Sequence, residues 1–519
     1  MIKQIELAIP PEQLHNEEAL KQSAASTLKI SAKEISSLIP VRRSIDARRK
    51  PVFKILFDVY IGELPQKNKS HINYQPVKDD KRAIIIGFGP GGMFAALRLI
   101  ELGIKPIIFE RGKDVRERRK DLRAIQQEHV VNPDSNYCFG EGGAGTYSDG
   151  KLYTRSVKRG NVKKILNIFV QHGADENILI DSHPHIGSNK LPKIVEAIRN
   201  TITGCGGEIH FNSKVTDLIL DNSKVKGIEV NDQIKIFADS VILSTGHSAR
   251  DIYYILNRKK IHIESKPFSL GFRIEHPQPL INEIQYHSEK IPENLPAATY
   301  NLSCNIGGSG VYSFCMCPGG IIVPAATSPG EIVVNGMSLS RRDSPFANSG
   351  FVVEINEKEL GPSFQSHEFP SLEFQKLMEK LSFKLANNSQ SAPAQRATDF
   401  LDSKFSQTLP KTSYIPGLTS SRLDKEFPEF LIRRLRDALK IFNNKMKGYL
   451  TSEAVLVAVE SRTSSPIRIP RDKDTMMHLK INGLFPCGEG AGYAGGIVSS
   501  AIDGENCALA VNNYLLTIN

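Results

Sequence analysis

The sequence predicts an α/β protein, in which strand–turn–helix units lie near residue 90 and at the C-terminal end and a mixed β-sheet region lies between them. A glycine-rich turn joins an apolar strand to an apolar helix near residue 90, and a second glycine-rich loop joins a strand to the last helix near residue 490. Between residues 261 and 449 the sequence has isolated strands and Gly/Pro turns, and no turn of this kind.

Composition limits the classes of protein to consider. The chain has 519 residues and a net charge of +10, with 40% hydrophobic and 24% charged residues. It is too long for one compact domain and too apolar to be disordered. The modest positive charge fits a solvated surface better than nucleic-acid binding. No stretch approaches the roughly 20 apolar residues of a membrane span, so we expect a cytoplasmic protein with no membrane association.

Seven cysteines in so long a chain exclude a disulfide framework, and none are spaced as paired zinc knuckles. We therefore expect reduced thiols and no metal site.

The N-terminal segment predicts a small β-α-β-β unit. Apolar and polar residues alternate over 2–9 and again over 53–60, and a helical pattern covers 17–28. The basic run VRRSIDARRK lies between the later strands and predicts an exposed hairpin, with phosphate binding as the alternative. A polar stretch, 64–81, follows as a linker.

The sequence GFGPGG after the strand 83–86 is a dinucleotide-binding turn. Gly87 permits the tight turn, Gly89 lets the backbone approach a pyrophosphate, and Gly92 lets helix and strand pack closely. Pro90 and Gly91 complete the turn, and the N-terminus of the helix that it opens faces the anion.

A second strand, 106–109, ends at Glu110, 23 positions after Gly87. A carboxylate at this place accepts hydrogen bonds from an adenosine ribose, and it would repel a 2′-phosphate. Arg111 follows directly, and we include it among the cofactor-binding residues.

Two further features favour FAD over NAD as the dinucleotide. The loop CFGEGGAGTYSDG, which contains Gly142, Gly143 and Gly145, is able to pass close to a long cofactor, although an ordinary surface loop is the alternative. A predicted meander of three strands, KVKGIEV, QIKIFA and DSVILSTG, ends at Thr245 and Gly246, whose small side chains allow close approach to the dinucleotide.

The last glycine-rich loop, Gly488 to Gly496, is the third feature. It contains a formal GxGxxG, but only 24 residues follow Gly495, which leaves no room for a second strand with a ribose-binding acid. We interpret the loop as closing the first cofactor site. Glu489 would bind ribityl or ribose hydroxyls, and the helix that begins near Ile497 would point its positive end at the flavin O2.

These motifs, together with YSFCMCPGG, ESRTSSP and SSAIDGENCA, resemble the uncharacterised FAD-dependent dehydrogenases, often called NAD(FAD)-utilising dehydrogenases. The resemblance covers nearly the whole chain. The chain is also similar to the wider glutathione-reductase-like flavoprotein superfamily, in which a Gly-Asp loop near the C-terminus contacts FAD. Here Glu489 replaces that Asp. The resemblance implies a bound flavin and an oxidoreductase activity.

We therefore predict a Rossmann-like FAD-binding domain with an inserted mixed β-sheet substrate domain and a small N-terminal β-α-β-β domain. The predicted limits are 1–76 for the N-terminal appendage, 80–260 and 466–519 for the FAD-binding domain, and 261–465 for the inserted domain.

His247 and Arg462 are candidate catalytic residues. His247 follows a strand end and could serve as a general acid or a hydrogen-bond donor to flavin, unless its role is structural. Arg462 could hold a substrate carboxylate or neutralise reduced flavin, with a Glu460–Arg462 salt bridge as the alternative. Arg273 is a weaker candidate of the same kind.

The pair Cys315 and Cys317 is the remaining redox candidate, with a buried structural role as the alternative. Two thiols are too few for a structural zinc site. Disulfide-reducing flavoenzymes carry a cysteine pair one helical turn apart soon after the first dinucleotide unit. This chain offers only Cys138 there, which argues against that type.

The leading hypothesis is an FAD-dependent oxidoreductase that moves a hydride through bound flavin to or from a small-molecule substrate. NAD(P)H would bind transiently at the flavin face. One alternative is a flavin-containing RNA-associated protein that uses VRRSIDARRK and the basic helix 111–123, although the stacking aromatics of such proteins are absent there. Another is a thiol oxidoreductase that uses Cys315 and Cys317. The sequence does not indicate an oligomeric state.

Overall fold

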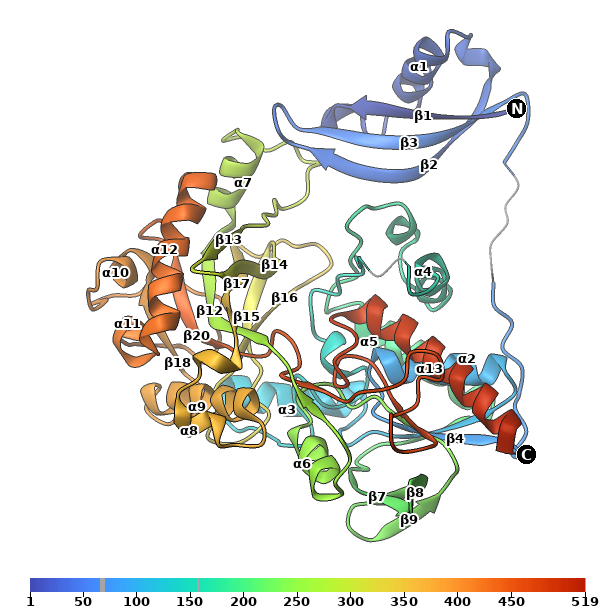
Figure 1. Cartoon of the computed structure of the whole chain (residues 1–519). Coiled ribbons are helices and arrows are strands. Elements are labelled where there is room, and N and C mark those ends of the chain that lie inside the picture. Colours follow the sequence, from blue (N-terminus) through green and yellow to red (C-terminus); the bar gives the residue numbers. More distant parts are fainter. Residues whose placement is uncertain (66–70, 156–157, 519) are drawn as a thin grey trace.

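The computed structural model describes residues 1–65, 71–155 and 158–518 (Figure 1). The predicted α/β fold is confirmed. Residues 66–70 of the expected linker lie outside the described residues. No helix in the described part of the chain combines the length and apolar character needed to cross a membrane.

The N-terminal unit is the expected β-α-β-β arrangement. It consists of β1 (Ile2–Ile9), α1 (Glu17–Leu28), β2 (Ile35–Asp46) and β3 (Val52–Ile61), in an antiparallel sheet of order β1-β3-β2. Alternate residues of β1 and β3 are buried, because one face of the sheet packs on the core and the other faces solvent.

A five-stranded parallel sheet forms the centre of the part that is predicted to bind the dinucleotide. Its order is β22 (Leu484–Pro486), β10 (Val241–Leu243), β4 (Arg82–Ile86), β5 (Lys105–Phe109) and β6 (Glu208–His210). The last strand of the chain therefore returns to lie beside β10. The helices that follow these strands or connect them are α2 (Pro90–Glu101), α3 (Val115–Gln127), α4 (Val162–Gln171), α5 (Leu191–Gly204), α6 (Arg250–Arg258) and α13 (Ile497–Ile518).

The predicted three-stranded meander is only partly right. β8 (Lys224–Val230) and β9 (Ile234–Phe237) join β7 (Val215–Asp221) in a separate antiparallel sheet, whereas β10 belongs to the parallel sheet. The reason is burial. All three residues of β10 are buried, as in a strand covered on both faces, and β9 is largely exposed.

The middle of the chain forms a seven-stranded mixed sheet of order β13-β14-β17-β12-β20-β18-β19. Its strands are β12 (Phe268–Pro277), β13 (Ser303–Ile306), β14 (Ser309–Cys317), β17 (Phe346–Ile355), β18 (Ala392–Arg396), β19 (Leu418–Ser420) and β20 (Val455–Glu460). Two ribbons accompany it, β15 (Gly320–Pro324) with β16 (Val334–Ser338) and β11 (Glu264–Ser265) with β21 (Ile467–Arg468).

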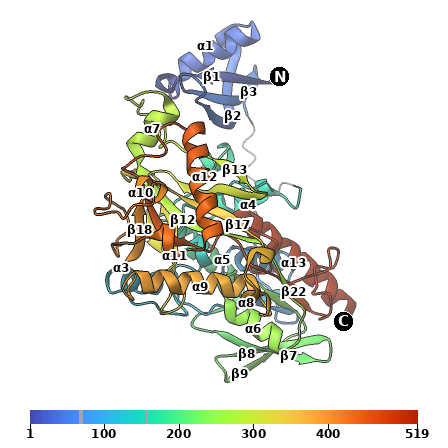
Figure 2. The ribbon, with the colours of Figure 1, turned by 60° about the vertical axis from the view of Figure 1, so that its left-hand side comes forward.

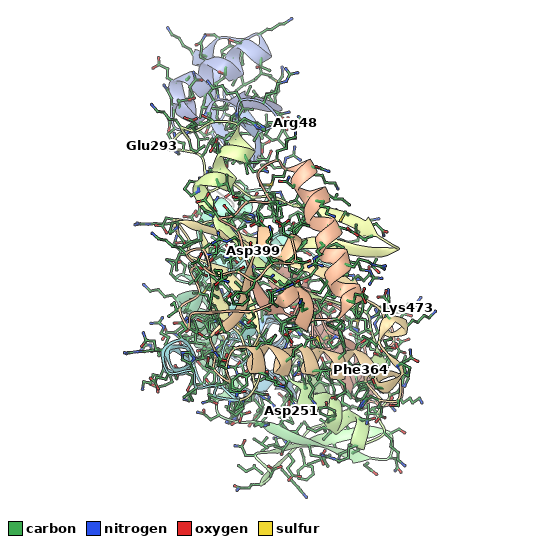
Figure 3. All side chains as sticks on the ribbon, turned by 90° about the vertical axis from the view of Figure 1, so that its left-hand side faces the viewer. Arg48, Asp251, Glu293, Phe364, Asp399 and Lys473 are labelled. Atoms are coloured by element: carbon green, nitrogen blue, oxygen red, sulfur yellow. The ribbon has the colours of Figure 1, made fainter. Side chains whose placement is uncertain are left out.

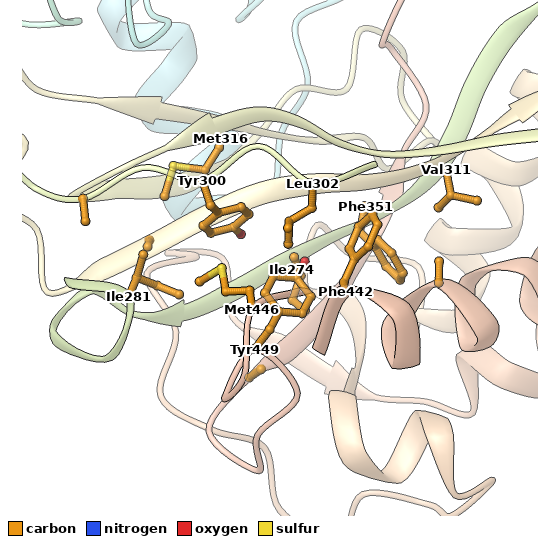
Figure 4. Close-up of a cluster of buried hydrophobic side chains, with 14 of the residues drawn as sticks. Ile274, Ile281, Tyr300, Leu302, Val311, Met316, Phe351, Phe442, Met446 and Tyr449 are labelled. Atoms are coloured by element: carbon orange, nitrogen blue, oxygen red, sulfur yellow. The ribbon is translucent and has the colours of Figure 1, made fainter. Parts of the chain in front are cut away.

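Helices cover this mixed sheet, and they are α7 (Gln278–Tyr286), α8 (Pro362–Gln365), α9 (Pro370–Leu385), α10 (Ala397–Leu401), α11 (Leu423–Glu426) and α12 (Glu429–Lys445). Helix α12 packs its apolar face against the sheet. Figure 4 shows the core between it and the sheet, where the rings of Phe351 and Phe442 lie 5.6 Å apart.

The N-terminal unit and the β7–β9 sheet stand at opposite ends of the molecule (Figure 2). Figure 3 shows Arg48 on the N-terminal unit and Asp251, at the start of α6, toward the other end. The basic run predicted as a hairpin lies in β2 and the turn after it, and three of its arginines pair with carboxylates: Arg42 with Glu6, Arg43 with Asp181 and Arg48 with Asp46.

Candidate functional site

A cavity of about 370 Å³ lies where the carboxyl ends of the parallel strands meet the mixed sheet. Open α/β sheets bind ligands at this edge. The predicted residues that line it are Gly87, Gly89, Pro90, Gly91, Glu110, Arg111, Gly143, Gly145, Thr245, Gly246, His247, Cys315, Cys317, Arg462, Gly488, Glu489, Gly496 and Ile497. The fold therefore brings segments from the whole length of the chain to one place.

Two predicted residues, Gly92 and Gly142, do not line the cavity. A Cβ on Gly92 would lie 2.1 Å from the Gly87 carbonyl oxygen, so its role is close packing of helix and turn. The Gly142 N–H donates to the Phe88 carbonyl oxygen at 2.8 Å. Both residues therefore support the wall of the cavity without facing it.

The turn between β4 and α2 fits a phosphate group. Gly87 has φ +94°, and a Cβ there would lie 2.5 Å from the Ser244 carbonyl oxygen, so no other residue fits without a shift. At Gly89, the residue before α2, a Cβ would have only the Gly143 Cα within 4 Å, at 3.8 Å. Bare backbone and the first residues of α2, Pro90 and Gly91, thus border the cavity at the positive end of the helix, which favours an anion.

Glu110 holds this turn in place. It is 4% exposed, and its Oε2 accepts a hydrogen bond from the Phe88 N–H at 2.9 Å. Its Oε1 accepts from the N–H groups of Gly112 and Gly140, both at 2.9 Å. A carboxylate has about four acceptor positions, so one remains for a ligand hydroxyl. The residue fits a ribose and also ties three loops together.

Arg111 is not a free cation. Its guanidinium pairs with Asp251 and lies 4.5 Å from the centre of the Phe139 ring. The side chain therefore forms a wall of the cavity, and its charge is balanced by Asp251.

His247 and Glu489 face each other in the cavity, with Nε2 and Oε1 3.8 Å apart. Burial, together with the charges of Arg462 and Arg250, lowers the pKa of His247 to about 3. Burial raises the pKa of Glu489 to about 7. His247 is therefore neutral near pH 7, and this argues against the predicted general-acid role of an imidazolium. Its buried Nδ1 has no hydrogen-bond partner within the described residues, which leaves the hydrogen-bonding role.

Arg462 forms a buried pair with Glu379 on α9. Its Nε lies 2.8 Å from Oε1, and its Nη2 lies 3.0 Å from Oε2. The alternative Glu460–Arg462 salt bridge is wrong, because Glu460 binds Arg273 at 2.9 Å. Glu460 and Arg273 belong to the paired strands β20 and β12, whereas Arg462 lies beyond the end of β20.

Sequence reasoning missed the rest of this charge cluster. Arg250 donates to Glu379 at 2.7 Å and pairs with Glu331 at 3.3 Å. The signal for Glu379 is its place on the buried face of α9, beside the apolar Leu372 and Met378. A carboxylate on such a face must be paired with a cation. Its partners lie far away in the sequence.

Three nearby side chains, those of Cys487, Asp503 and Cys507, have ligand atoms within 4.8 Å of one another. The guanidinium of Arg471 lies against them, with Asp503 oxygens at 2.6 and 2.9 Å and the Cys507 Sγ at 3.6 Å. A cation therefore already satisfies this group. Asp503 also accepts from the Gly488 N–H at 2.7 Å, which fixes the C-terminal loop.

Comparison with known families gives two matches. Residues 267–463 match the family described as FAD-dependent protein, C-terminal domain-like, and residues 1–60 match a domain of unknown function, DUF8436. An uncharacterized protein from Clostridium beijerinckii (strain ATCC 51743 / NCIMB 8052) is 37% identical over 510 residues, which cover 94% of this chain and 95% of that protein.

Solved structures also resemble the chain. CtdE in complex with FAD matches with a TM-score of 0.33 and 13% identity, over 85% of this chain and 88% of that one. A geranylgeranyl bacteriochlorophyll reductase-like protein from Thermoplasma acidophilum has a TM-score of 0.35 and 12% identity, over 84% and 80%. These scores are too low to carry further conclusions. Membership of the glutathione-reductase-like superfamily stays a prediction.

Proposed function

The chain belongs to the same family as the Clostridium beijerinckii protein, and its residues 267–463 match a domain described for FAD-dependent proteins, so we propose that it is an FAD-dependent oxidoreductase. The observation that carries the proposal is the single cavity shared by the glycine turn, Glu110, the second glycine loop and the start of α13. These are the parts that a dinucleotide with an adenosine ribose needs.

We assign the pyrophosphate to the turn that includes Gly87 and Gly89, and the adenosine ribose to Glu110. Gly143 and Gly145 would line the middle of the cofactor. The flavin end would lie near Glu489 and Ile497. When bound, FAD supplies a ring system that accepts or releases a hydride.

The side chains at the flavin end have separate tasks. The N-terminal end of α13 carries a partial positive charge that stabilises negative charge at the ring edge. His247 is neutral, and its unpartnered Nδ1 offers one hydrogen bond. Arg462 is held rigidly by Glu379, so it contributes a fixed electrostatic field to the cavity. The predicted substrate-carboxylate role of Arg462 requires its Nη1, which has no partner within the described residues.

NAD(P)H is one candidate electron donor. The second formal GxGxxG leads into α13, and its Gly495 borders the first cavity. A nicotinamide donor would therefore have to enter the same cavity as the substrate and leave before it binds.

The visible spectrum of the purified protein tests the proposal, followed by anaerobic addition of NADH and then NADPH. Flavin absorbance that one of them bleaches would identify a reductase. Flavin that neither bleaches would point to a substrate that supplies the electrons itself. A colourless protein that does not take up added FAD would refute the proposal.

A single substitution tests where the cofactor pyrophosphate binds. Gly89→Arg places a long side chain where we assign the pyrophosphate, so we expect a folded, colourless protein. Gly204→Arg is the matched control, because a Cβ at Gly204 meets nothing within 4 Å. Normal flavin content in Gly89→Arg would contradict the assignment.

The RNA-binding alternative has less support. Arg42, Arg43 and Arg48 of the basic run each already have a carboxylate partner. Binding to RNA that weakens with salt and disappears when these arginines are replaced would revive it, and no binding at low salt would remove it.

A further inference from the structure

The end of β14 carries an irregularity that presents two cysteines to the cavity. Phe314 pairs with Gly350 and Cys317 pairs with Asn348. Between these two pairs β14 therefore advances by three residues and β17 by two. One extra residue is therefore inserted, as in a β-bulge. Cys315 takes up the extra length with φ +44°, a conformation that side chains other than glycine rarely adopt.

Two cations hold the backbone of this bulge. The ammonium group of Lys151 donates to the Met316 carbonyl oxygen. The Arg273 Nη2 donates to the Cys315 carbonyl oxygen at 2.8 Å. Arg273 is completely buried and is itself fixed by Glu460 at 2.9 Å. The bulge is thus a supported feature, and its conformation does not depend on a ligand.

The two thiols differ in access. Cys315 is exposed and Cys317 is buried, yet both line the cavity. The Cys317 Sγ donates to the Cys315 carbonyl oxygen at 3.3 Å and accepts a hydrogen bond from the Arg273 Nη2 at 3.5 Å. A guanidinium in this position stabilises negative charge on the Cys317 sulfur.

The Cys317 side chain turns back toward Cys315 at the bulge. Its Sγ lies 3.3 Å from the carbonyl oxygen of Cys315. Because only one residue separates the two cysteines, a disulfide between them would require a local rearrangement of the bulge.

We propose that Cys315 and Cys317 form a redox-active dithiol pair, in which Cys315 exchanges with small-molecule disulfides and Cys317 resolves the mixed disulfide. The proposal does not depend on bound FAD.

In the oxidising direction, the Cys315 sulfur loses its proton to solvent and attacks a disulfide such as oxidised glutathione, which releases one glutathione thiolate. The Cys317 sulfur, also deprotonated, then attacks the Cys315 sulfur and releases the second thiolate. Two thiols become one disulfide, and one glutathione disulfide becomes two thiols. In the reverse direction Cys317 is the leaving group, and Arg273 stabilises it.

The reaction depends on pH through Cys315. Cys315 is exposed to the cavity, and the protein walls of that cavity desolvate the thiol and raise its pKa, against the opposing charges of Lys151 and Arg273. The thiolate is the reactive form. The first exchange step should therefore speed up about tenfold for each pH unit from 7 to 9.

The test uses the purified protein in buffers of graded reduced-to-oxidised glutathione ratio, quenched with N-ethylmaleimide and analysed by peptide mass spectrometry. We expect a peptide that contains both cysteines to lose two hydrogen atoms as the ratio falls and to regain them on reduction. In Cys317→Ser the reaction should stop with glutathione on Cys315. In Cys315→Ser no adduct should form on Cys317.

Cys138→Ser is the matched control, because Cys138 lines the same cavity but lies on the glycine-rich loop of the nucleotide-binding part. It should leave the oxidation midpoint unchanged. Two results would overturn the proposal: both thiols staying reduced under fully oxidising glutathione in the folded wild-type protein, or a glutathione adduct on wild-type Cys315 that never resolves. Circular dichroism checks that each variant is folded.

Discussion

Glu110 offers a demanding test of the proposed cofactor site, because one carboxylate both organises the site and faces the ligand. In Glu110→Gln the amide oxygen can keep the two bonds from Gly112 and Gly140. The amide nitrogen then points at the Phe88 N–H, which loses its acceptor. Leaving one buried donor unpaired costs about 1–3 kcal/mol. We expect the free energy of unfolding to fall by that amount.

The same substitution weakens cofactor binding. A hydrogen bond from a ribose hydroxyl to a charged acceptor contributes about 1.5–3 kcal/mol, which corresponds to a roughly 10- to 150-fold rise in the Kd for FAD. Titration of the apoprotein with FAD measures this. The chain has no tryptophan, so urea unfolding is best followed by circular dichroism.

Glu208→Gln is the control for Glu110→Gln. Glu208 lies on the neighbouring β6, is 43% exposed and pairs with Lys105 at 2.7 Å. An exposed pair of this kind contributes less than about 1 kcal/mol, so stability and FAD affinity should barely change. If Glu110→Gln behaves like Glu208→Gln in both measurements, the role that we give to Glu110 is wrong.

Two further predictions concern other carboxylates in and beside the cavity. Glu379→Gln leaves Arg250 and Arg462 with one negative charge fewer, so it should lower the free energy of unfolding by about 3–5 kcal/mol. Glu373→Gln on the same helix is the control. It removes a partly exposed ion pair and should lower the free energy of unfolding by less than about 1 kcal/mol in the same urea titration. The pKa of Glu489 is raised to about 7 in the folded protein, so its stabilising effect is present at low pH and is lost as pH rises toward 7. The apoprotein should lose up to about 3 kcal/mol from this group between pH 4.5 and 7, and Glu489→Gln should flatten that part of the Tm-versus-pH curve.

The sequence predicts local structure well where one short segment decides the outcome. The turn at Gly87 follows its strand directly and opens its helix, so the motif contains all the information needed to place it. The same holds for the final helix, which begins at Ile497 as expected. Each of these features is indicated by residues within about ten positions, because turn glycines and helix starts follow local backbone preferences.

Partners across the chain are a different problem. Arg462 has a carboxylate two residues away in the sequence, but the strand register turns Glu460 toward Arg273, and the helix that carries Glu379 supplies the actual partner. Likewise, the short strand β10 looks like the third strand of a meander until the five-stranded sheet is assembled around it. Both errors come from treating proximity in sequence as proximity in space.

Two parts of the chain form the walls of the cavity. The nucleotide-binding segments contribute glycine backbone, from Gly87 to the start of α13, and the side chains of Glu110, Arg111, His247 and Glu489. The mixed sheet and its flanking loops contribute Cys315, Cys317 and Arg462, none of which we assign to the phosphate or the ribose. Substitutions on the mixed-sheet wall should therefore change which substrate reacts, with FAD content preserved, and substitutions on the opposite wall should remove FAD itself.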